Sequence, residues 1–102
     1  MTPADKYVLR LYVTGLTPRS TRAITAVREV CEQHLQGNYE LEIIDVYQQP
    51  GRISADQIVA IPTLVKQKPA PQRLVVGDMT DKARLLFGLG LPLDHMVTIE
   101  RR

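Results

Sequence analysis

The residues that bear most directly on chemistry are Pro62, which precedes a short β-type run, and Cys31, the one cysteine of the chain. A disulfide oxidoreductase needs a low-pKa thiolate at the start of a helix and a resolving cysteine three residues further on. The segment that would carry this pair, residues 15–20, contains no cysteine. Cys31 instead recurs with apolar residues at helical spacing, which is typical of a small buried side chain. The sequence therefore argues against redox catalysis.

Metal and acid–base chemistry find little support. His34 lies near the end of an expected surface helix and His95 lies in a C-terminal stretch without a clear pattern, and neither has a partner at metal-ligand spacing. Asp45 interrupts an apolar strand, so we expect it to be hydrogen-bonded or to lie at the end of the sheet. The glycines of the Phe-Gly-Leu-Gly stretch lack the lysine and the context of a phosphate-binding loop. We expect no metal, no cofactor and no catalytic residue.

Basic side chains form the clearest candidate for a binding surface. The set consists of Arg22, Lys66, Lys68 and Arg73, with Arg19 and Arg52 nearby in sequence. We expect the start of the long helix and the hairpin to converge at one end of a sheet, where these residues would form a positive patch suited to an acidic protein surface. The alternative interpretation is ordinary solvated charge.

The first half of the chain predicts a β–α–β unit. Residues 6–13 alternate between two faces, as in a half-buried strand. Thr17 and Pro18 have the residue types of a helix N-cap and first helical position, and apolar residues then recur at steps of three and four over residues 19–36. Residues 39–47 carry apolar side chains on both faces, which predicts a central strand. We expect the two strands to be parallel.

The second half predicts a helix, a hairpin and a last helix. Ser54 and Gln57 have capping-box spacing, so we expect a short helix from residue 55 to about 60, ended by Pro62. Residues 63–67 and 72–77 read as antiparallel strands joined by a proline-rich turn. A final helix begins at 79 or 81 and runs to 87, capped by Asp78 or Thr80. This order of elements is the thioredoxin-like topology.

Composition fits one small domain over residues 1–102, with residues 94–102 as a flexible tail. Hydrophobic residues make up 44% and charged residues 24% of the chain, and the net charge is +2. This balance argues against nucleic-acid or membrane partners. The N-terminus lacks an apolar signal core and the single cysteine fits a reducing compartment, so we expect a cytoplasmic protein.

Four stretches together resemble the KaiB family of circadian clock proteins over about residues 6–91. They read LRLYVTGLTPRSTRAI, YELEIIDVYQQP, ADQIVAIPTLVKQKPAPQRLVVGD and DKARLLFGL. The resemblance implies a non-enzymatic, metamorphic α/β protein. At rest it is a homotetramer, a dimer of dimers, whose second half is rearranged into two helices and a final strand. A rare monomer takes the thioredoxin-like order and binds a KaiC-like ATPase, captures KaiA and competes with the kinase SasA.

The resemblance also implies which residues act. The expected partner-binding residues are Arg22, Gln57, Lys66, Lys68 and Arg73, and the expected fold-switch residues are Pro62, Pro69, Pro71, Gly88 and Gly90. We expect Pro62 to be trans in the tetramer and cis in the monomer, and Gly88→Ala to favour the monomer.

Several positions depart from the family pattern. Gln57 replaces a lysine, Leu74 a second arginine and Gly90 an aspartate, and the chain ends in Thr-Ile-Glu-Arg-Arg rather than in an acidic tail. The alternative hypothesis is therefore a KaiB-like paralogue that acts outside a full clock, in stress or environmental adaptation, through a histidine kinase or another protein partner.

Overall fold

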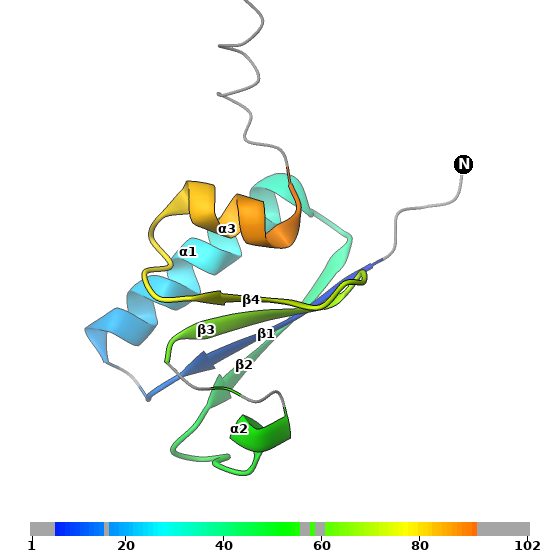
Figure 1. Cartoon of the computed structure of the whole chain (residues 1–102). Helices are drawn as coiled ribbons and strands as arrows, with labels where there is room; N and C mark the ends of the chain where they lie inside the picture. The colour runs from blue at the N-terminus through cyan, green and yellow to red at the C-terminus, as the bar shows by residue number, and fades with distance from the viewer. Residues whose placement is uncertain (1–5, 16, 56–57, 59–60, 92–102) are drawn as a thin grey trace, which may run out of the picture.

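The computed structural model describes residues 6–15, 17–55, 58 and 61–91. Along the described residues, three helices and four strands follow one another in the order β–α–β–α–β–β–α (Figure 1). Their bounds are β1 (Tyr7–Val13), α1 (Pro18–His34), β2 (Tyr39–Asp45), α2 (Arg52–Ala55), β3 (Thr63–Lys68), β4 (Arg73–Val76) and α3 (Lys82–Leu89). The predicted order of elements is confirmed in both halves of the chain.

The strands form one four-stranded sheet in the order β2-β1-β3-β4. β1 and β2 are parallel, as expected of a β–α–β unit, with Leu11 opposite Ile43. β3 runs antiparallel to β1 and β4 antiparallel to β3, which confirms the predicted hairpin. The expectation that β2 is a central strand is wrong, because β2 lies at the edge of this sheet. Its apolar residues face both ways because each face of the sheet is covered at that edge.

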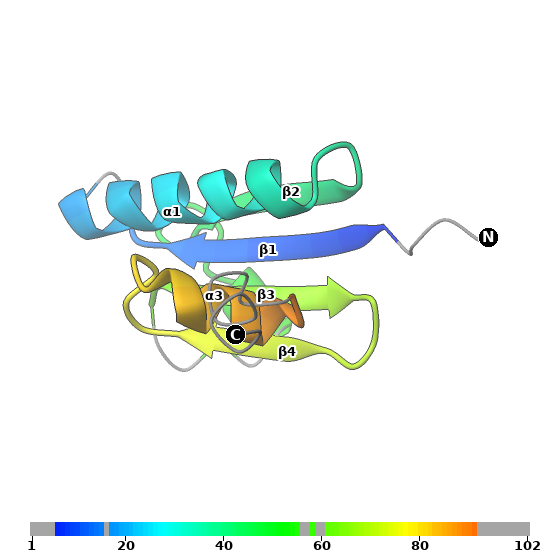
Figure 2. The ribbon, with the colours of Figure 1, turned by 90° about the horizontal axis from the view of Figure 1, so that it is seen from above.

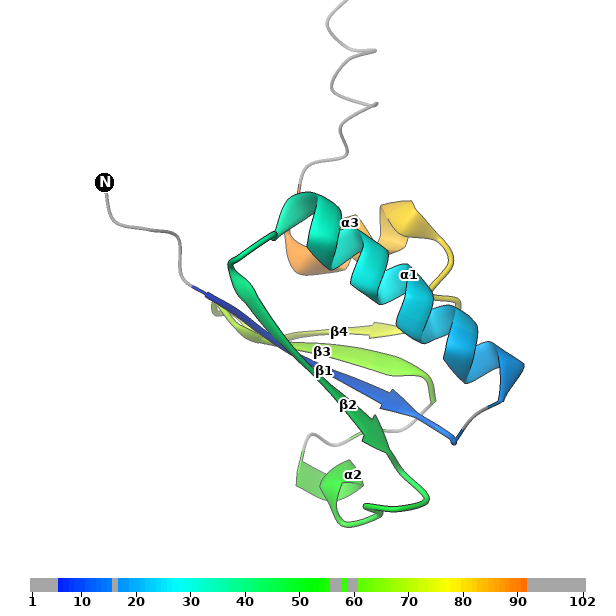
Figure 3. The same ribbon diagram turned by 180° about the vertical axis from the view of Figure 1, so that it is seen from behind.

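Helices α1 and α3 cover one face of the sheet, and α2 lies on the opposite face (Figures 1 and 3). Seen from above, α1 lies over β1 and β2, and α3 lies over β3 and β4 (Figure 2). The larger core cluster includes Leu9, Leu11, Val27 and Leu64 between the sheet and these helices. The smaller cluster on the α2 side contains Tyr12, Ile44, Val46, Ile58 and Val65. The alternation predicted for β1 is thus confirmed.

The helix starts agree with prediction only in part. Thr17 caps α1 as expected, and its hydroxyl accepts the Ser20 amide. α2 begins at Arg52 rather than at the predicted residue 55. Ser54 lies inside it with its hydroxyl donating to the Gly51 carbonyl, so Ser54 is not the predicted N-cap. Gln57, the other residue of the predicted capping box, lies outside the described residues. α3 is capped by Asp81 rather than by Asp78 or Thr80, because the Asp78 carboxylate already accepts bonds from Thr80.

The second half of the chain has the thioredoxin-like arrangement in this structure. The peptide bonds that precede Pro62, Pro69 and Pro71 are all cis, so Pro62 has the isomer that we expect for this arrangement. The rearranged half that the resemblance implies for a resting tetramer is a different state and stays a prediction. Among the described residues, no helix is both long and apolar enough to cross a bilayer.

Candidate functional site

The start of α1 carries the first group of basic residues. Arg19 and Arg22 line a polar pocket together with Pro62, Asp78 and Thr80. The Thr80 hydroxyl and amide bond to the Asp78 carboxylate and lower its pKa, and the two arginines lower it further. Because Asp78 balances part of the arginine charge, this end of the sheet is positive but not strongly so.

The second group lies along the hairpin. Lys66 on β3 is directly opposite Arg73 on β4, and Lys68 pairs with Val8 at the far end of β1. Burial lowers the pKa of Lys66, which is only 5% exposed, and the neighbouring Arg73 lowers it further. Two like charges face each other here, and no ion pair to either is found among the described residues.

The expected convergence of the basic residues at one end of the sheet is wrong. Thr63 pairs with Tyr12 at the end where α1 starts, and Lys68 pairs with Val8 at the other end. Each residue along β3 moves the chain by roughly 3.3 Å away from Arg22. The exposed cations Arg22, Lys68 and Arg73 are therefore spread along the molecule, and the buried Lys66 contributes positive potential rather than contact area.

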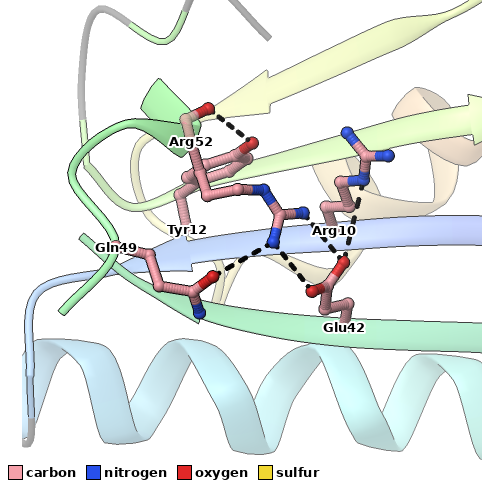
Figure 4. Close-up of polar contacts among 5 residues, drawn as sticks. All are labelled: Arg10, Tyr12, Glu42, Gln49 and Arg52. Atoms are coloured by element: carbon pink, nitrogen blue, oxygen red, sulfur yellow. Dashed lines mark hydrogen bonds and ion pairs between the residues drawn. The ribbon is translucent and has the colours of Figure 1, made fainter. Parts of the chain in front are cut away.

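Arg52 does not belong to a positive patch, because it is paired with a carboxylate. Its guanidinium donates two hydrogen bonds of 3.0 Å to Glu42, and Arg10 approaches the same carboxylate at 3.9 Å (Figure 4). The Tyr12 hydroxyl donates to the Arg52 carbonyl at 3.1 Å, and Gln49 accepts a further bond from the guanidinium. This network fastens α2 to β1 and β2. Glu42 is the residue that could have indicated this network from the sequence, because the parallel pairing of β1 and β2 places it opposite Arg10.

Neither the start of α1 nor Cys31 presents an accessible thiol in this structure. The Ser20 hydroxyl, near the start of α1, accepts the Thr14 amide and bonds to Thr17, so the helix start is closed by its own side chains. Cys31 is fully buried, and burial followed by the nearby Glu32 raises its pKa to about 11. At neutral pH the thiol is protonated and inaccessible.

Asp45 lies where its residue type requires a hydrogen-bonding role. It is the last residue of β2, and its carboxylate accepts the amides of Gly15 at 3.2 Å and Tyr47 at 2.9 Å. The sequence-based expectation for Asp45 is thus confirmed. Over the part of the chain that the structure describes, no group of three His, Cys, Asp or Glu residues could hold a metal ion.

The two candidate glycines lie at the end of α3. Gly88 packs so closely on β4 that an added Cβ would lie 2.1 Å from Val75 Cγ2. Gly90 is the C-cap and has φ 76°, a left-handed backbone that favours glycine. Alanine at Gly88 therefore opposes the arrangement seen here, contrary to the direction expected above. Gln57, His95 and residues 94–102 lie outside the described residues.

Comparison with known proteins places this fold in a family. Residues 10–91 match the family model described as the KaiB domain. The chain belongs to the KaiB family. It is 47% identical over 97 residues to the circadian clock oscillator protein KaiB of Trichodesmium erythraeum, covering 94% of this chain and 93% of that protein. It is 44% identical over 96 residues to the KaiB of Prochlorococcus marinus strain MIT 9313, covering 94% and 81%.

Solved structures agree with the thioredoxin-like arrangement. The N-terminal domain of Synechococcus elongatus SasA matches with a TM-score of 0.70 at 26% identity, covering 88% of this chain and 89% of that domain. Mitochondrial thioredoxin 3 of Saccharomyces cerevisiae matches with a TM-score of 0.67 at 13% identity, covering 84% and 78%, which is a likeness of fold alone. This member of the KaiB family thus has an arrangement of helices and strands like that of the SasA N-terminal domain.

Proposed function

We propose that this chain is a non-enzymatic clock regulator that binds a KaiC-like ATPase and modulates its phosphorylation cycle. The observation that carries the proposal is the match to the KaiB domain over residues 10–91. The buried, protonated Cys31 and the closed start of α1 support a role without thiol catalysis. On this proposal the protein acts in the cytoplasm and forms a dimer or tetramer at rest.

The binding form is the thioredoxin-like arrangement described above. In it, Arg22 is exposed near the start of α1 and Arg73 is exposed on β4, so both can contact an acidic surface. Lys68 adds charge at the end of β3, and buried Lys66 adds to the potential beneath Arg73. Gln57 and the glycines Gly88 and Gly90 remain in the proposed set of binding and fold-switch residues, as do Pro62, Pro69 and Pro71.

Co-migration with the cognate KaiC-like ATPase tests this proposal. The chain and the ATPase are incubated with ATP for many hours and separated by size exclusion. We expect a complex, and we expect Arg22→Glu to weaken it at least tenfold, since reversing one interfacial charge costs about 2 kcal/mol or more. Arg28→Glu makes the same change at another exposed position of α1 and serves as the control. No complex, or equal loss with both variants, would contradict the proposal.

A second candidate is a partner of the histidine-kinase type. The observation that favours it is the likeness to the SasA N-terminal domain, with a TM-score of 0.70. On this hypothesis the chain acts outside a full clock and competes with, or replaces, such a domain. Within a full clock, the proposal includes KaiA as a partner. Recovery of a histidine kinase but no KaiC-like ATPase in a pull-down with the purified chain would favour this candidate.

A further inference from the structure

A groove at the β4 edge of the sheet carries exposed apolar residues that the function proposed above does not explain. It has a volume of about 530 Å³ and lies between β4 and α3. Among the described residues, four large apolar side chains are exposed, and three belong to residues that line this groove: Leu74 at 43%, Val76 at 36% and Phe87 at 68%. Leu74 is opposite Val65, so it and Val76 are on the α2 face of the sheet, whereas Phe87 is on α3 at the other face. The fourth, Tyr47, lies elsewhere on the molecule. Exposed apolar side chains on both sides of one sheet edge suit the side chains of an added strand, which point alternately to the two faces.

The backbone of β4 adds directional hydrogen-bonding groups to this groove. β4 is the last strand of the sheet order, and the Gly77 amide donates back toward β3, to the Pro62 carbonyl. Since peptide groups alternate in direction along a strand, those of Val76 and Leu74 point away from β3. The Arg84 guanidinium confirms this direction, because it donates to the Val76 carbonyl at 2.6 Å. An outward row of backbone groups is what an added strand recognises.

The charge of the groove selects the kind of segment that can bind. Of the described residues that line it, two are charged, the exposed Arg73 and Arg84, and none is acidic. A second copy pairing β4 with β4 would bring these arginines of both copies together, which is unfavourable. A carboxylate would instead form a charge-assisted bond with Arg84, stronger than its present bond to a neutral carbonyl.

We propose that this groove binds an extended acidic and apolar segment of a partner protein, which adds to the sheet beside β4. Its backbone pairs with Leu74, and alternate side chains pack on Phe87 and on Val76. A carboxylate of the segment draws Arg84 away from the Val76 carbonyl, which then becomes available to the added strand. Arg73 lines this groove and also belongs to the residues proposed to contact the ATPase. Phe87 and Arg84, which the experiment below changes, do not belong to that set, so either proposal can fail alone.

Fluorescence anisotropy with the full chain and two labelled peptides tests the site without any ATPase. Both peptides alternate isoleucine and threonine; one has glutamate at either end and the other has lysine. We expect the glutamate peptide to bind about tenfold or more tightly than the lysine peptide, and added salt to reduce the difference. We also expect the amides of Leu74 and Val76 to become protected from hydrogen exchange in the complex.

Matched variants decide where the peptide binds. Phe87→Ser removes the largest exposed side chain of the groove and should weaken binding about tenfold. Tyr47→Ser makes the same kind of change at an aromatic residue that is 75% exposed outside the groove, and binding should not change. Arg84→Gln should abolish the preference for glutamate, which keeps the proposal testable if Phe87→Ser does not fold.

Three results would overturn the proposal. The two peptides could bind equally or not at all, or Phe87→Ser and Tyr47→Ser could have equal effects. Sedimentation could also reveal a self-associated species that Phe87→Ser dissociates, in which case the occupant is a second copy of the chain.

Discussion

Cys31 shows how burial makes a thiol unreactive. Its thiol is fully buried in α1, and burial, followed by the nearby Glu32, raises its pKa from 9.0 to about 11. Below pH 9 the folded and unfolded thiols are both protonated, so this contribution to stability is fully present. Between pH 9 and about 11 the unfolded thiol ionises first, and the contribution is lost.

We therefore expect Cys31 to react with a thiol reagent in the native protein only as fast as the chain opens. Cys31→Ala should lower the free energy of unfolding by about 1 kcal/mol through lost packing, and it should flatten the fall in stability above pH 9. Urea titrations of both proteins at several pH values measure this. Rapid labelling of the native protein at neutral pH would contradict the buried position.

For Lys66, the predicted change of stability with pH has the opposite sign to that for Cys31. Its folded pKa is lowered by burial and by Arg73, so the charged form is disfavoured in the folded state. This penalty is fully present below the folded pKa and disappears as pH rises to the ordinary value of 10.5.

Lys66→Met should therefore raise the free energy of unfolding at neutral pH, by about 1 kcal/mol, because it removes a buried charge and keeps the stem. The gain should shrink as pH approaches 10.5. Lys68→Met, at an exposed position two residues on, should change stability by less than about 0.5 kcal/mol and serves as the control. Destabilisation by Lys66→Met at neutral pH would show that Lys66 has a stabilising partner.

Local pattern could predict some residue roles and not others. The alternation of β3 places Lys66 on the same face as Leu64, so the burial of Lys66 could have been predicted from the sequence. Asp45 was predicted because an acid in an apolar strand requires hydrogen-bond donors. The pairing of Arg52 with Glu42 was not, because it joins α2 to a strand whose neighbours only the folded sheet defines.

At the scale of elements, α2 is attached by two kinds of polar contact that differ in strength. The bidentate pair of Arg52 and Glu42 is partly exposed, with side-chain exposures of 29% and 50%, and pairs of this kind contribute about 0.5 kcal/mol. The Tyr12 hydroxyl is buried, and a buried hydrogen bond contributes about 1 kcal/mol.

We expect Tyr12→Phe to destabilise the protein more than Arg52→Met does. The effect of Arg52→Met should diminish in high salt, and that of Tyr12→Phe should not. Chemical denaturation of both variants at low and high salt measures the difference. A larger loss for Arg52→Met would show that the ion pair, rather than the hydroxyl, holds α2.

The packing of α3 on β4 leaves no space at Gly88. An added methyl would lie 2.1 Å from the buried and branched Val75 side chain. We expect Gly88→Ala to destabilise this arrangement by about 1–3 kcal/mol, more than the helix preference of alanine recovers. Gly51→Ala is the control, since a Cβ at Gly51 meets nothing within 4 Å. Unchanged or increased stability of the arrangement described here would contradict this packing.

Element boundaries were predictable where a single side chain decides them. Thr17 before Pro18 has no nearby competitor, and it caps α1 as expected. Asp78 and Asp81 both precede α3, and only the structure shows that Thr80 bonds to the first and leaves the second to cap the helix. Ser54 and Gln57 have the right spacing for a cap, yet α2 has already begun at Arg52.

At the scale of the whole molecule, the sequence predicts the order of the elements and the direction of consecutive strands, but not which strands lie side by side in the sheet. The helix between β1 and β2 requires a parallel pair, and the short proline-rich turn requires an antiparallel one. Nothing in the local sequence indicates that β3 pairs with β1. This pairing makes β2 and β4 the edge strands of the sheet. That pairing also separates Lys68 from Arg22, which is why the expected single patch is divided.

On the proposed function, the arrangement described here, and not the rearranged one, is the form that binds the ATPase. Val65 and Leu74 are opposite each other on β3 and β4, between the pairs whose backbones are hydrogen-bonded. Cysteines at both positions, in a Cys31→Ala background, can therefore join the two strands in this arrangement.

The decisive measurement is the rate at which the oxidised and reduced forms of this Val65→Cys, Leu74→Cys variant bind the KaiC-like ATPase. We predict that the oxidised form binds without the long incubation that the reduced form needs, and that it is monomeric by size exclusion. Failure of the oxidised form to bind, while the reduced form binds, would show that the arrangement described here is not the binding form.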